Sequence, residues 1–225
     1  GYFWGYKTLG VFQNQSEIDT FLANGGVTKQ GSPKPGDLIF QDTDGNGVID
    51  EKDKTFIGNP HPDFTGSFSL NLAYKGLDFS VTAYGAFGQQ VMKSYRSFSD
   101  TPNDNYTTDV YTKYWTGEGS TNRYPSFSYG KNENFKDISD IYVENADYVK
   151  ISNVTIGYNF KNAWKNLPAS QLRIYVAAQN LFTISGYSGM DPEVGDGAGY
   201  SWTSGIDSGY YPSSRTFMVG INLKF

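Results

Sequence analysis

The chain has 225 residues, of which 38% are hydrophobic and 17% aromatic, and its mean hydropathy is −0.50. No apolar run approaches the ~18 residues that a membrane-spanning helix needs, so helical membrane insertion is excluded. The absence of cysteine excludes a disulfide framework, thiolate zinc sites and thiol catalysis, and the formal charge of −5 argues against a nucleic-acid partner. Low hydropathy with 18 Tyr and 16 Phe is typical of a transmembrane β-barrel, whose polar lumen dilutes the hydropathy while interfacial girdles add aromatics. A soluble lectin-like sandwich shares this composition.

The first residues, GYFWGYKTLG, carry neither an initiator methionine nor the basic and apolar regions of a secretory signal. An exported protein needs such a signal, so we expect this sequence to be a C-terminal portion of a longer protein. Further along, NQSEIDTFLANGG predicts a short helix, because Ile18, Phe21 and Leu22 fall on one helical face between Ser16 as N-cap and Gly25 as stop. We interpret this helix as a packed loop element.

The segment DTDGNGVIDEKD, from Asp42 to Asp53, has the spacing of an EF-hand-like calcium loop. Such loops place oxygen ligands at positions 1, 3, 5, 7, 9 and 12, with a backbone carbonyl at 7 and a glycine at 6 for the sharp turn. Gly47 occupies the turn position, and the last ligand is an aspartate where glutamate is usual. A turn-rich loop without metal is the alternative interpretation. The spacing predicts a structural calcium ion held by Asp42, Asp44, Asn46, Val48, Asp50 and Asp53.

The sequence gives little support for an enzymatic function. The single histidine, His61, lies between two prolines in GNPHPDFTG, which indicates a rigid turn at the start of a strand and not the setting of a general base. No nucleophile elbow, HExxH or phosphate-binding glycine–lysine loop occurs. A glycosidase-like pair of Asp191 with Glu193 or Glu118 can be imagined, but nothing in the sequence brings these carboxylates together. We therefore expect no enzymatic activity and no catalytic residue.

Two adjacent segments show the period-2 alternation of β-strands. DFTGSFSLNLAY (63–74) and LDFSVTAYGAFG (77–88) place apolar residues at nearly every second position. Only Lys75 and Gly76 separate them. A two-residue link with glycine second predicts a tight antiparallel hairpin.

Three more strands are predicted towards the C-terminus. In the first, Tyr148 to Phe160, the apolar residues change phase near Ser152 and Asn153, which predicts either a bulge or the emergence of the strand from the membrane there. The last, 216–225, alternates up to Phe225, which is typical of a strand that closes a membrane barrel, although the edge strand of a secreted sandwich is the alternative. Between them, QLRIYVAAQ (171–179) has a polar face that carries Arg173, Tyr175 and Gln179.

The connections between these strands alternate in length. Residues 75–76 and 161–170 form short links, whereas 89–146 and 183–213 are long, polar segments rich in Tyr, Gly, Ser, Asn and Asp. Bacterial outer-membrane barrels show the same asymmetry, with short periplasmic turns and long extracellular loops. We therefore predict an all-β fold in which 63–225 form the C-terminal strands of a large antiparallel transmembrane barrel with two long extracellular loops. Residues 1–62 are expected to be a largely extracellular loop region.

Several stretches resemble one known family. PGDLIFQDTDGNGVIDEKDKTFIGNPHPDFTGSFSLNLAYKGLDFSV, YWTGEGSTNRYPSF, ENADYVKISNVTIGYNF and IYVAAQNLFTISGYSGMDPEV are similar, in the same order, to the late barrel region of the SusC/RagA family. These are TonB-linked outer-membrane transporters of the Bacteroidetes. The resemblance implies a plugged barrel of about 22 strands, of which this chain supplies the last part, while the plug and the TonB-binding segment lie outside it.

The resemblance also implies partners. Family members import glycans, or in some cases peptides, together with a SusD-like surface lipoprotein that forms a lid, and they draw energy from TonB. Membrane lipid would surround the strands. The long loops are rich in aromatics, which we interpret as packing or lid-contact residues more than as direct substrate contacts. These are Tyr106, Tyr111, Tyr114, Trp115, Tyr124, Phe127 and Tyr129 in the first loop, and Tyr187, Tyr200, Trp202, Tyr210 and Tyr211 in the second.

A non-transporting function stays open from the sequence alone. The alternative is a secreted all-β carbohydrate-binding module with a calcium-stabilised loop. The two differ in their apolar strand faces, because a barrel exposes them to lipid whereas a sandwich buries them.

Overall fold

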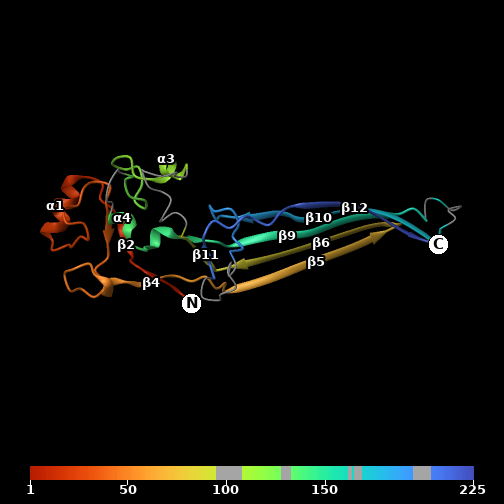
Figure 1. The fold of residues 1–225 in the computed structure, drawn as a ribbon, viewed down its shortest axis with the longest axis horizontal. Helices are drawn as coiled ribbons and strands as arrows, with labels where there is room; N and C mark the ends of the chain where they lie inside the picture. Colours follow the sequence, from red (N-terminus) through yellow and green to blue (C-terminus); the bar gives the residue numbers. More distant parts are fainter. Residues whose placement is uncertain (95–107, 128–132, 162–163, 165–168, 195–203) are drawn as a thin grey trace. The chain divides into compact units, whose positions relative to one another are not determined.

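The computed structural model describes residues 1–94, 108–127, 133–161, 164, 169–194 and 204–225 (Figure 1). The chain separates into two compact units. The N-terminal region and most of both long connections belong to one unit, here called the loop unit: Gly1–Pro60, Gln90–Glu144 and Val194–Tyr210. The strands form the other, here called the sheet unit: His61–Gln89, Asn145–Glu193 and Tyr211–Phe225.

The sheet unit is one antiparallel sheet of five long strands in the order β12-β10-β9-β6-β5 (Figure 1). All the predicted strands are confirmed. Their bounds are Phe64–Tyr74 for β5, Leu77–Phe87 for β6, Tyr148–Asn159 for β9, Gln171–Ser185 for β10 and Thr216–Lys224 for β12. Among the described residues, none of the helices has the length and hydropathy needed to span a bilayer.

The strand register gives the sheet one continuous apolar face. Directly paired positions line up Leu72, Phe79, Ile156, Val176 and Val219 across all five strands. Four of these side chains are exposed, with Val219 at 76% of its full accessibility. A soluble domain rarely exposes an apolar surface of this extent, so this face requires a lipid or protein environment.

A bulge in the first half of β9 explains the predicted change of phase. The β6–β9 register shifts between Thr82 and Ala83, which pair with Asn153 and Ile151, so that Ser152 has no partner position. The Ser152 hydroxyl donates a hydrogen bond to the Thr82 carbonyl at 3.0 Å.

A second bulge makes β10 longer than the sequence indicates. The β9–β10 register shifts between Gln179 and Phe182, and Asn180 adopts a positive φ of 51°. Asparagine tolerates this conformation, and pairing resumes after it. The end predicted at Gln179 is therefore wrong, and β10 continues past the predicted start of the loop at Thr183 to Ser185.

The short hairpin is confirmed. Lys75 and Gly76 join β5 to β6 with φ angles of 48° and 92°. Positive φ at both central residues is the two-residue turn whose twist matches that of a β-hairpin. The other short link, 161–170, lies mostly outside the described residues.

The loop unit has small sheets and short helices around its own core. Its main core cluster consists of Tyr6, Val11, Leu38, Phe40, Ile49, Ile141 and Tyr142. Its strands pair as β1–β4, β2–β3 and β11–β7–β8, with bounds Phe3–Gly5 for β1, Thr8–Val11 for β2, Leu38–Phe40 for β3, Thr55–Gly58 for β4, Gln90–Lys93 for β7, Val143–Asn145 for β8 and Ile206–Asp207 for β11. Its helices are α1 (Gln15–Ala23), α3 (Asp109–Lys113), α4 (Glu133–Lys136) and the single turns η1 (Glu51–Asp53) and η2 (Asp140–Tyr142).

The predicted helix is present as α1, but its N-cap is not Ser16. Asn14 caps the helix with its side-chain oxygen, which accepts a hydrogen bond from the Glu17 N–H at 2.9 Å. Asparagine and serine are both good N-caps, and the sequence offers them two positions apart. Gly25, with a positive φ of 83°, follows the end of the helix as expected.

Candidate functional site

The second face of the sheet is mostly polar. One of its rows is polar on all five strands and consists of Ser69, Thr82, Asn153, Gln179 and Thr216. The row of Asn71, Ser80 and Thr155 continues instead into the apolar Ala177 and Met218. A wall with one apolar and one polar face separates lipid from a water-filled space. We call this second side the polar face.

An ion pair lies on the polar face near the hairpin end of the strands. The Arg173 guanidinium donates to both carboxylate oxygens of Asp78, at 2.8 and 2.5 Å, and its Cζ lies 4.8 Å from the ring centroid of Tyr175. Gly157 makes room for it, because a Cβ there would lie 2.4 Å from the Arg173 Nη2. The sequence placed Arg173 and Tyr175 on this face but missed Asp78, whose proximity depends on β9 lying between β6 and β10.

A second cluster lies at the other end of the polar face, around Glu193. Its carboxylate accepts hydrogen bonds from Lys150 and the Tyr84 hydroxyl, and a longer one from the Tyr148 hydroxyl at 3.3 Å. The Lys150 side chain is only 4% exposed and that of Glu193 is 21% exposed. Glu193 follows β10 in the chain and lies back over β6 and β9. The segment after β10 is thereby tied to the wall of the sheet.

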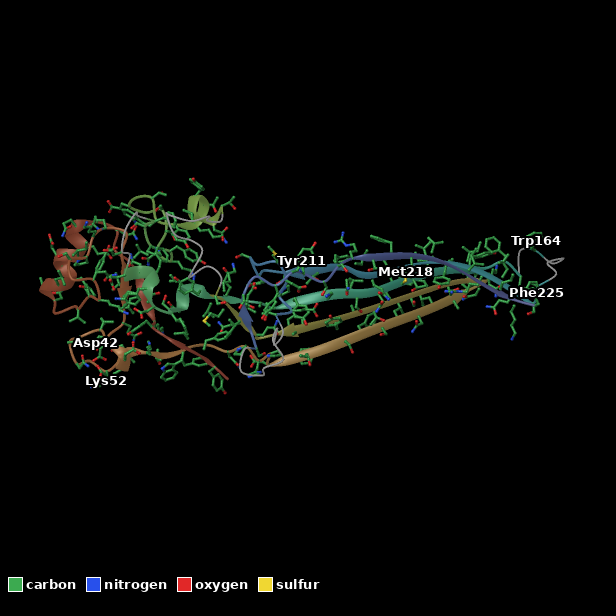
Figure 2. The ribbon with its side chains drawn as sticks, in the orientation of Figure 1. Asp42, Lys52, Trp164, Tyr211, Met218 and Phe225 are labelled. Atoms are coloured by element: carbon green, nitrogen blue, oxygen red, sulfur yellow. The ribbon has the colours of Figure 1, made fainter. Side chains whose placement is uncertain are left out.

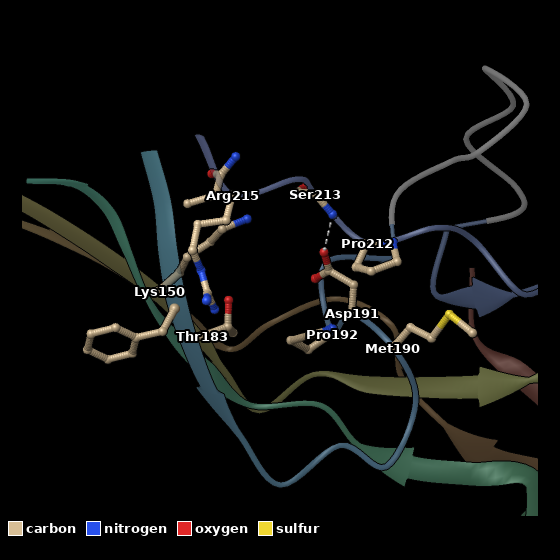
Figure 3. Close-up of a pocket in the computed structure, with 10 residues that line it drawn as sticks. Lys150, Thr183, Met190, Asp191, Pro192, Pro212, Ser213 and Arg215 are labelled. Atoms are coloured by element: carbon tan, nitrogen blue, oxygen red, sulfur yellow. Dashed lines mark hydrogen bonds between the residues drawn. The ribbon is translucent and has the colours of Figure 1, made fainter. Parts of the chain in front are cut away.

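A pocket of about 240 Å³ opens beside this cluster (Figure 3). Asp191 and Arg215 lie on different sides of it. The Asp191 carboxylate accepts from the backbone N–H groups of Glu193 at 3.0 Å and Ser213 at 3.2 Å, which joins the segments before β12 and after β10. The pocket is lined by Lys150, Asn180, Phe182, Thr183, Met190, Asp191, Pro192, Pro212, Ser213 and Arg215.

These contacts bear on the imagined glycosidase pair. Glu193 is bound by Lys150 and two tyrosines, and both oxygens of Asp191 are bound by backbone N–H groups. Glu118 accepts a hydrogen bond from the Asn14 side chain at 2.6 Å in the loop unit. Each carboxylate therefore has a structural role that explains its presence.

The carboxylate loop from Asp42 to Asp53 gathers three of the predicted ligands (Figure 2 labels Asp42). Carboxylate oxygens of Asp42, Asp44 and Asp53 lie within 4.8 Å of one another. Ile49, inside the loop, packs into the main core cluster and fixes the loop to the unit. Oxygen donors of this kind, brought together by one short loop, suit a hard cation such as calcium.

The remaining predicted ligands make local contacts. The Asn46 side-chain oxygen accepts from the Val48 N–H, and the Asp50 carboxylate accepts from the Lys52 N–H, each at 2.8 Å. Asp50 thereby caps the single turn η1, with Asp53 completing the capping box. Calcium at this loop stays a prediction.

Asp53 organises the loop through its fully buried side chain. It accepts hydrogen bonds from the N–H groups of Thr43 and Asp50, both at 2.7 Å, and from Asp44 at 3.4 Å. Burial raises the pKa of the Asp53 carboxyl, but these N–H groups and the Asp42 side chain together hold its pKa below the ordinary 3.8. The loop is therefore built around an ionised carboxylate.

Acid is expected to loosen this loop. The pKa of the Asp53 carboxyl is lower in the folded state than in the unfolded state. The stabilisation that the ionised carboxylate gives to the loop is therefore fully present above about pH 4 and is lost as the pH falls through the folded-state pKa. Asp53→Asn should lower the stability of the loop at neutral pH by about 1–3 kcal/mol and remove this pH dependence. Hydrogen exchange of residues 42–54 between pH 3 and pH 7 measures both effects. An unchanged acid profile in Asp53→Asn would contradict this role.

The loop aromatics mostly pack. Tyr114 is buried, stacks on Tyr124 at 5.6 Å between centroids and contacts Phe127 edge-on at 5.8 Å. Trp115 and Tyr124 pack against the main core cluster. Tyr187 is also buried, whereas Tyr210 and, more fully, Tyr111 and Tyr211 are exposed. Tyr106, Tyr129, Tyr200 and Trp202 lie outside the described residues.

Comparison with known proteins gives consistent relatives. The chain is 33% identical over 230 residues to the TonB-dependent receptor P3 of Formosa agariphila, with all of this chain and 22% of that protein covered. It is 31% identical over 204 residues to the TonB-dependent receptor SusC of Bacteroides thetaiotaomicron, with 85% of this chain and 18% of that protein covered. No family model matches. The chain thus spans about a fifth of the length of these relatives.

Solved structures show the same fold. The RagAB peptide transporter matches with a TM-score of 0.69 at 20% identity, over all of this chain and 22% of the matched chain. The RagAB peptide importer in its 'open-open' state matches with a TM-score of 0.68. The two-faced sheet is therefore a portion of a β-barrel wall.

Proposed function

This chain belongs to the SusC/RagA-like TonB-dependent receptors, and we propose that it forms part of the barrel wall and outer loops of an importer for glycans or peptides. Such receptors are β-barrels of the outer membrane, which is where this chain is placed. The observation that carries the proposal is the difference between the two faces of the sheet: the row of Leu72 is apolar on all five strands, whereas the row of Ser69 is polar on all five. The apolar face meets lipid, and the polar face lines the lumen.

The loop unit is proposed to lie outside the cell. Both long connections enter it from the same end of the strands, opposite the Lys75–Gly76 hairpin. Long loops are extracellular in outer-membrane barrels. There the unit would meet a SusD-like lipoprotein, with the exposed Tyr111 as one contact. The exposed Tyr211, at the start of the last segment of the sheet unit, would be another. The plug, the remaining strands and the TonB contact would come from other parts of the receptor.

Nothing in the sheet or in the relatives favours the secreted carbohydrate-binding module, and the relatives are named as receptors and an importer, not as enzymes. Membrane extraction tests the proposal. The native protein should stay with the outer membrane after carbonate washing and dissolve only in detergent. Recovery in the aqueous fraction without detergent would contradict it.

A structural calcium ion is proposed at the carboxylate loop. Asp42, Asp44 and Asp53 would supply carboxylates, with Asn46, the Val48 carbonyl and Asp50 as further donors, because their spacing is that of an EF-hand-like loop. Neutralising three converging carboxylates would stabilise the loop and hold its segment of the loop unit in place. An affinity on the order of 10⁻⁴–10⁻³ M is expected, as in extracellular modules.

Hydrogen exchange tests the calcium site. In the full receptor, residues 42–54 should exchange at least about tenfold more slowly with about 10 mM calcium than with chelator, because bound metal slows opening by the factor 1 + [Ca²⁺]/Kd. Asp42→Ala with Asp44→Ala should abolish this difference without changing exchange in the strands. Asp19→Ala, on the exposed helix α1, is the matched control. Equal protection with calcium and with chelator would show a turn-rich loop without metal.

A further inference from the structure

A notch interrupts the apolar face where β5, β6 and β9 meet, near the end that leads into the long connections. It has a volume of about 230 Å³ and is centred on the paired glycines Gly66 and Gly85. Ala83, Phe68 and Phe87 wall it on the apolar side. Val149 of β9 completes that side, whereas Ser67 and Tyr84, which also line it, point their side chains to the polar face.

The notch is hollow because two opposed positions lack a Cβ. At Gly85 a Cβ would lie 2.5 Å from the Tyr148 carbonyl oxygen, so the strand pairing there requires glycine. At Gly66 a Cβ would meet only the edge of the Phe64 ring, at 3.1 Å, and its φ is not positive. A side chain at position 66 is therefore sterically possible. Its absence leaves the space open.

Aromatic rings border the open space. Phe64 and Phe87 are stacked with their centroids 6.2 Å apart, and Phe68 lies on the hairpin side of the glycines. Phe64 and Phe68 are 63% and 60% exposed. A chain of methylenes that enters the notch therefore contacts ring faces and the sheet floor on three sides, whereas on the flat part of the wall it contacts one side only.

We propose that this notch binds one acyl chain of a membrane lipid. The notch is continuous with the apolar face that meets the bilayer, so lipid chains are the groups that reach it. Gly66 and Phe68 lie two and four residues inside the end of β5, about 7–14 Å along the strand. Apolar side chains of the same face flank the notch in both directions along β5, Phe64 on one side and Leu70 on the other, so it belongs to the apolar band that acyl chains cover. The proposal depends on the membrane assignment of the sheet and not on the substrate of the receptor.

Filling the notch tests the proposal. The probe is lipid A, the acylated lipid of the extracellular leaflet, titrated into the detergent-purified full receptor and counted by native mass spectrometry. Each methylene displaced from an apolar site costs about fourfold in affinity. Gly66→Leu should therefore weaken the tightest lipid-binding event at least about tenfold. Ala83→Leu fills the notch from β6 and should do the same, which guards against a folding defect specific to position 66.

The control is Val176→Phe, which adds comparable bulk to the apolar face away from the notch, where Val176 is 52% exposed and pairs with Ile156 and Val219. It should bind lipid as the unmodified receptor does. Equal lipid binding in all four proteins would overturn the proposal. So would unchanged lipid binding with loss of a receptor dimer in both notch variants, because the occupant would then be a second copy of the chain.

Discussion

Replacing Val81 with arginine should destabilise the receptor by about 2–4 kcal/mol, the cost of a guanidinium on the lipid face near the middle of a barrel wall. Val81 lies at the centre of β6 and pairs with Leu70 and Val154, so its row is apolar on both sides. The arginine would have to reach an interface across several neighbouring apolar side chains. The measurement is the denaturant midpoint of the reconstituted receptor, together with the amount assembled in the outer membrane.

Ser80→Arg provides the matched control, because Ser80 is the preceding residue and lies at the same depth on the polar face. It pairs with Asn71 and Thr155, and Asp78 lies on the same face two residues away. A charge there stays hydrated, so the change should be within about 1 kcal/mol. Equal losses in Val81→Arg and Ser80→Arg would mean that the two faces of β6 have the same surroundings, and would refute a lipid face.

Glu193→Ala should have the second large effect, because it leaves the ammonium of Lys150 buried without its carboxylate. Removing one member of a buried ion pair costs about 3–5 kcal/mol, and the lower end applies here because Glu193 is 21% exposed. The segment 186–193 should lose its tie to the wall and exchange its amide hydrogens much faster. The strands β6 and β9 should keep their slow exchange, since their backbone pairing does not involve Glu193.

A double variant distinguishes loss of the contact between segment 186–193 and the sheet from a general packing defect. Lys150→Met with Glu193→Leu replaces both charges with apolar groups of similar size, so stability should recover to within about 1 kcal/mol of the unmodified receptor. Exchange in 186–193 should stay faster than normal, because the hydrogen bonds of Tyr84 and Tyr148 to Glu193 are also lost. Normal exchange in Glu193→Ala would contradict the tie.

The strands were predictable because one face of each meets lipid and the other meets water. This difference makes apolar and polar residues alternate along the sequence. The bulge at Ser152 was predictable for the same reason, since an extra residue shifts the phase of the pattern. The bulge after Gln179 was not, because the residues around it, Asn180 to Phe182, break the alternation in the way that the start of a loop does. The continuation of the strand becomes visible only in the structure, where residues 182–185 pair with residues 151–148 of β9.

The candidate sites were predictable where they are local. Residues 42–53 form one loop, so the spacing of the aspartates in the sequence was enough to predict that their carboxylates lie together. The partners of Glu193 and Arg173 lie 43 and 95 residues away from them, at Lys150 and Asp78. No local pattern marks such pairs, because they are set by which strands are neighbours. The same limit applies to the notch, where two unremarkable glycines matter only because the register places them opposite each other.

Cysteine labelling along β9 tests whether the sheet separates lipid from a hydrated lumen. Single cysteines at Asn153, Val154, Thr155 and Ile156, in a receptor otherwise free of cysteine, are treated in intact outer membranes with a water-soluble maleimide and, separately, with a lipophilic one. Positions 153 and 155 should react with the water-soluble reagent, whereas 154 and 156 should react only with the lipophilic one. Equal reaction of all four positions with the water-soluble reagent would contradict a wall between lipid and a hydrated lumen.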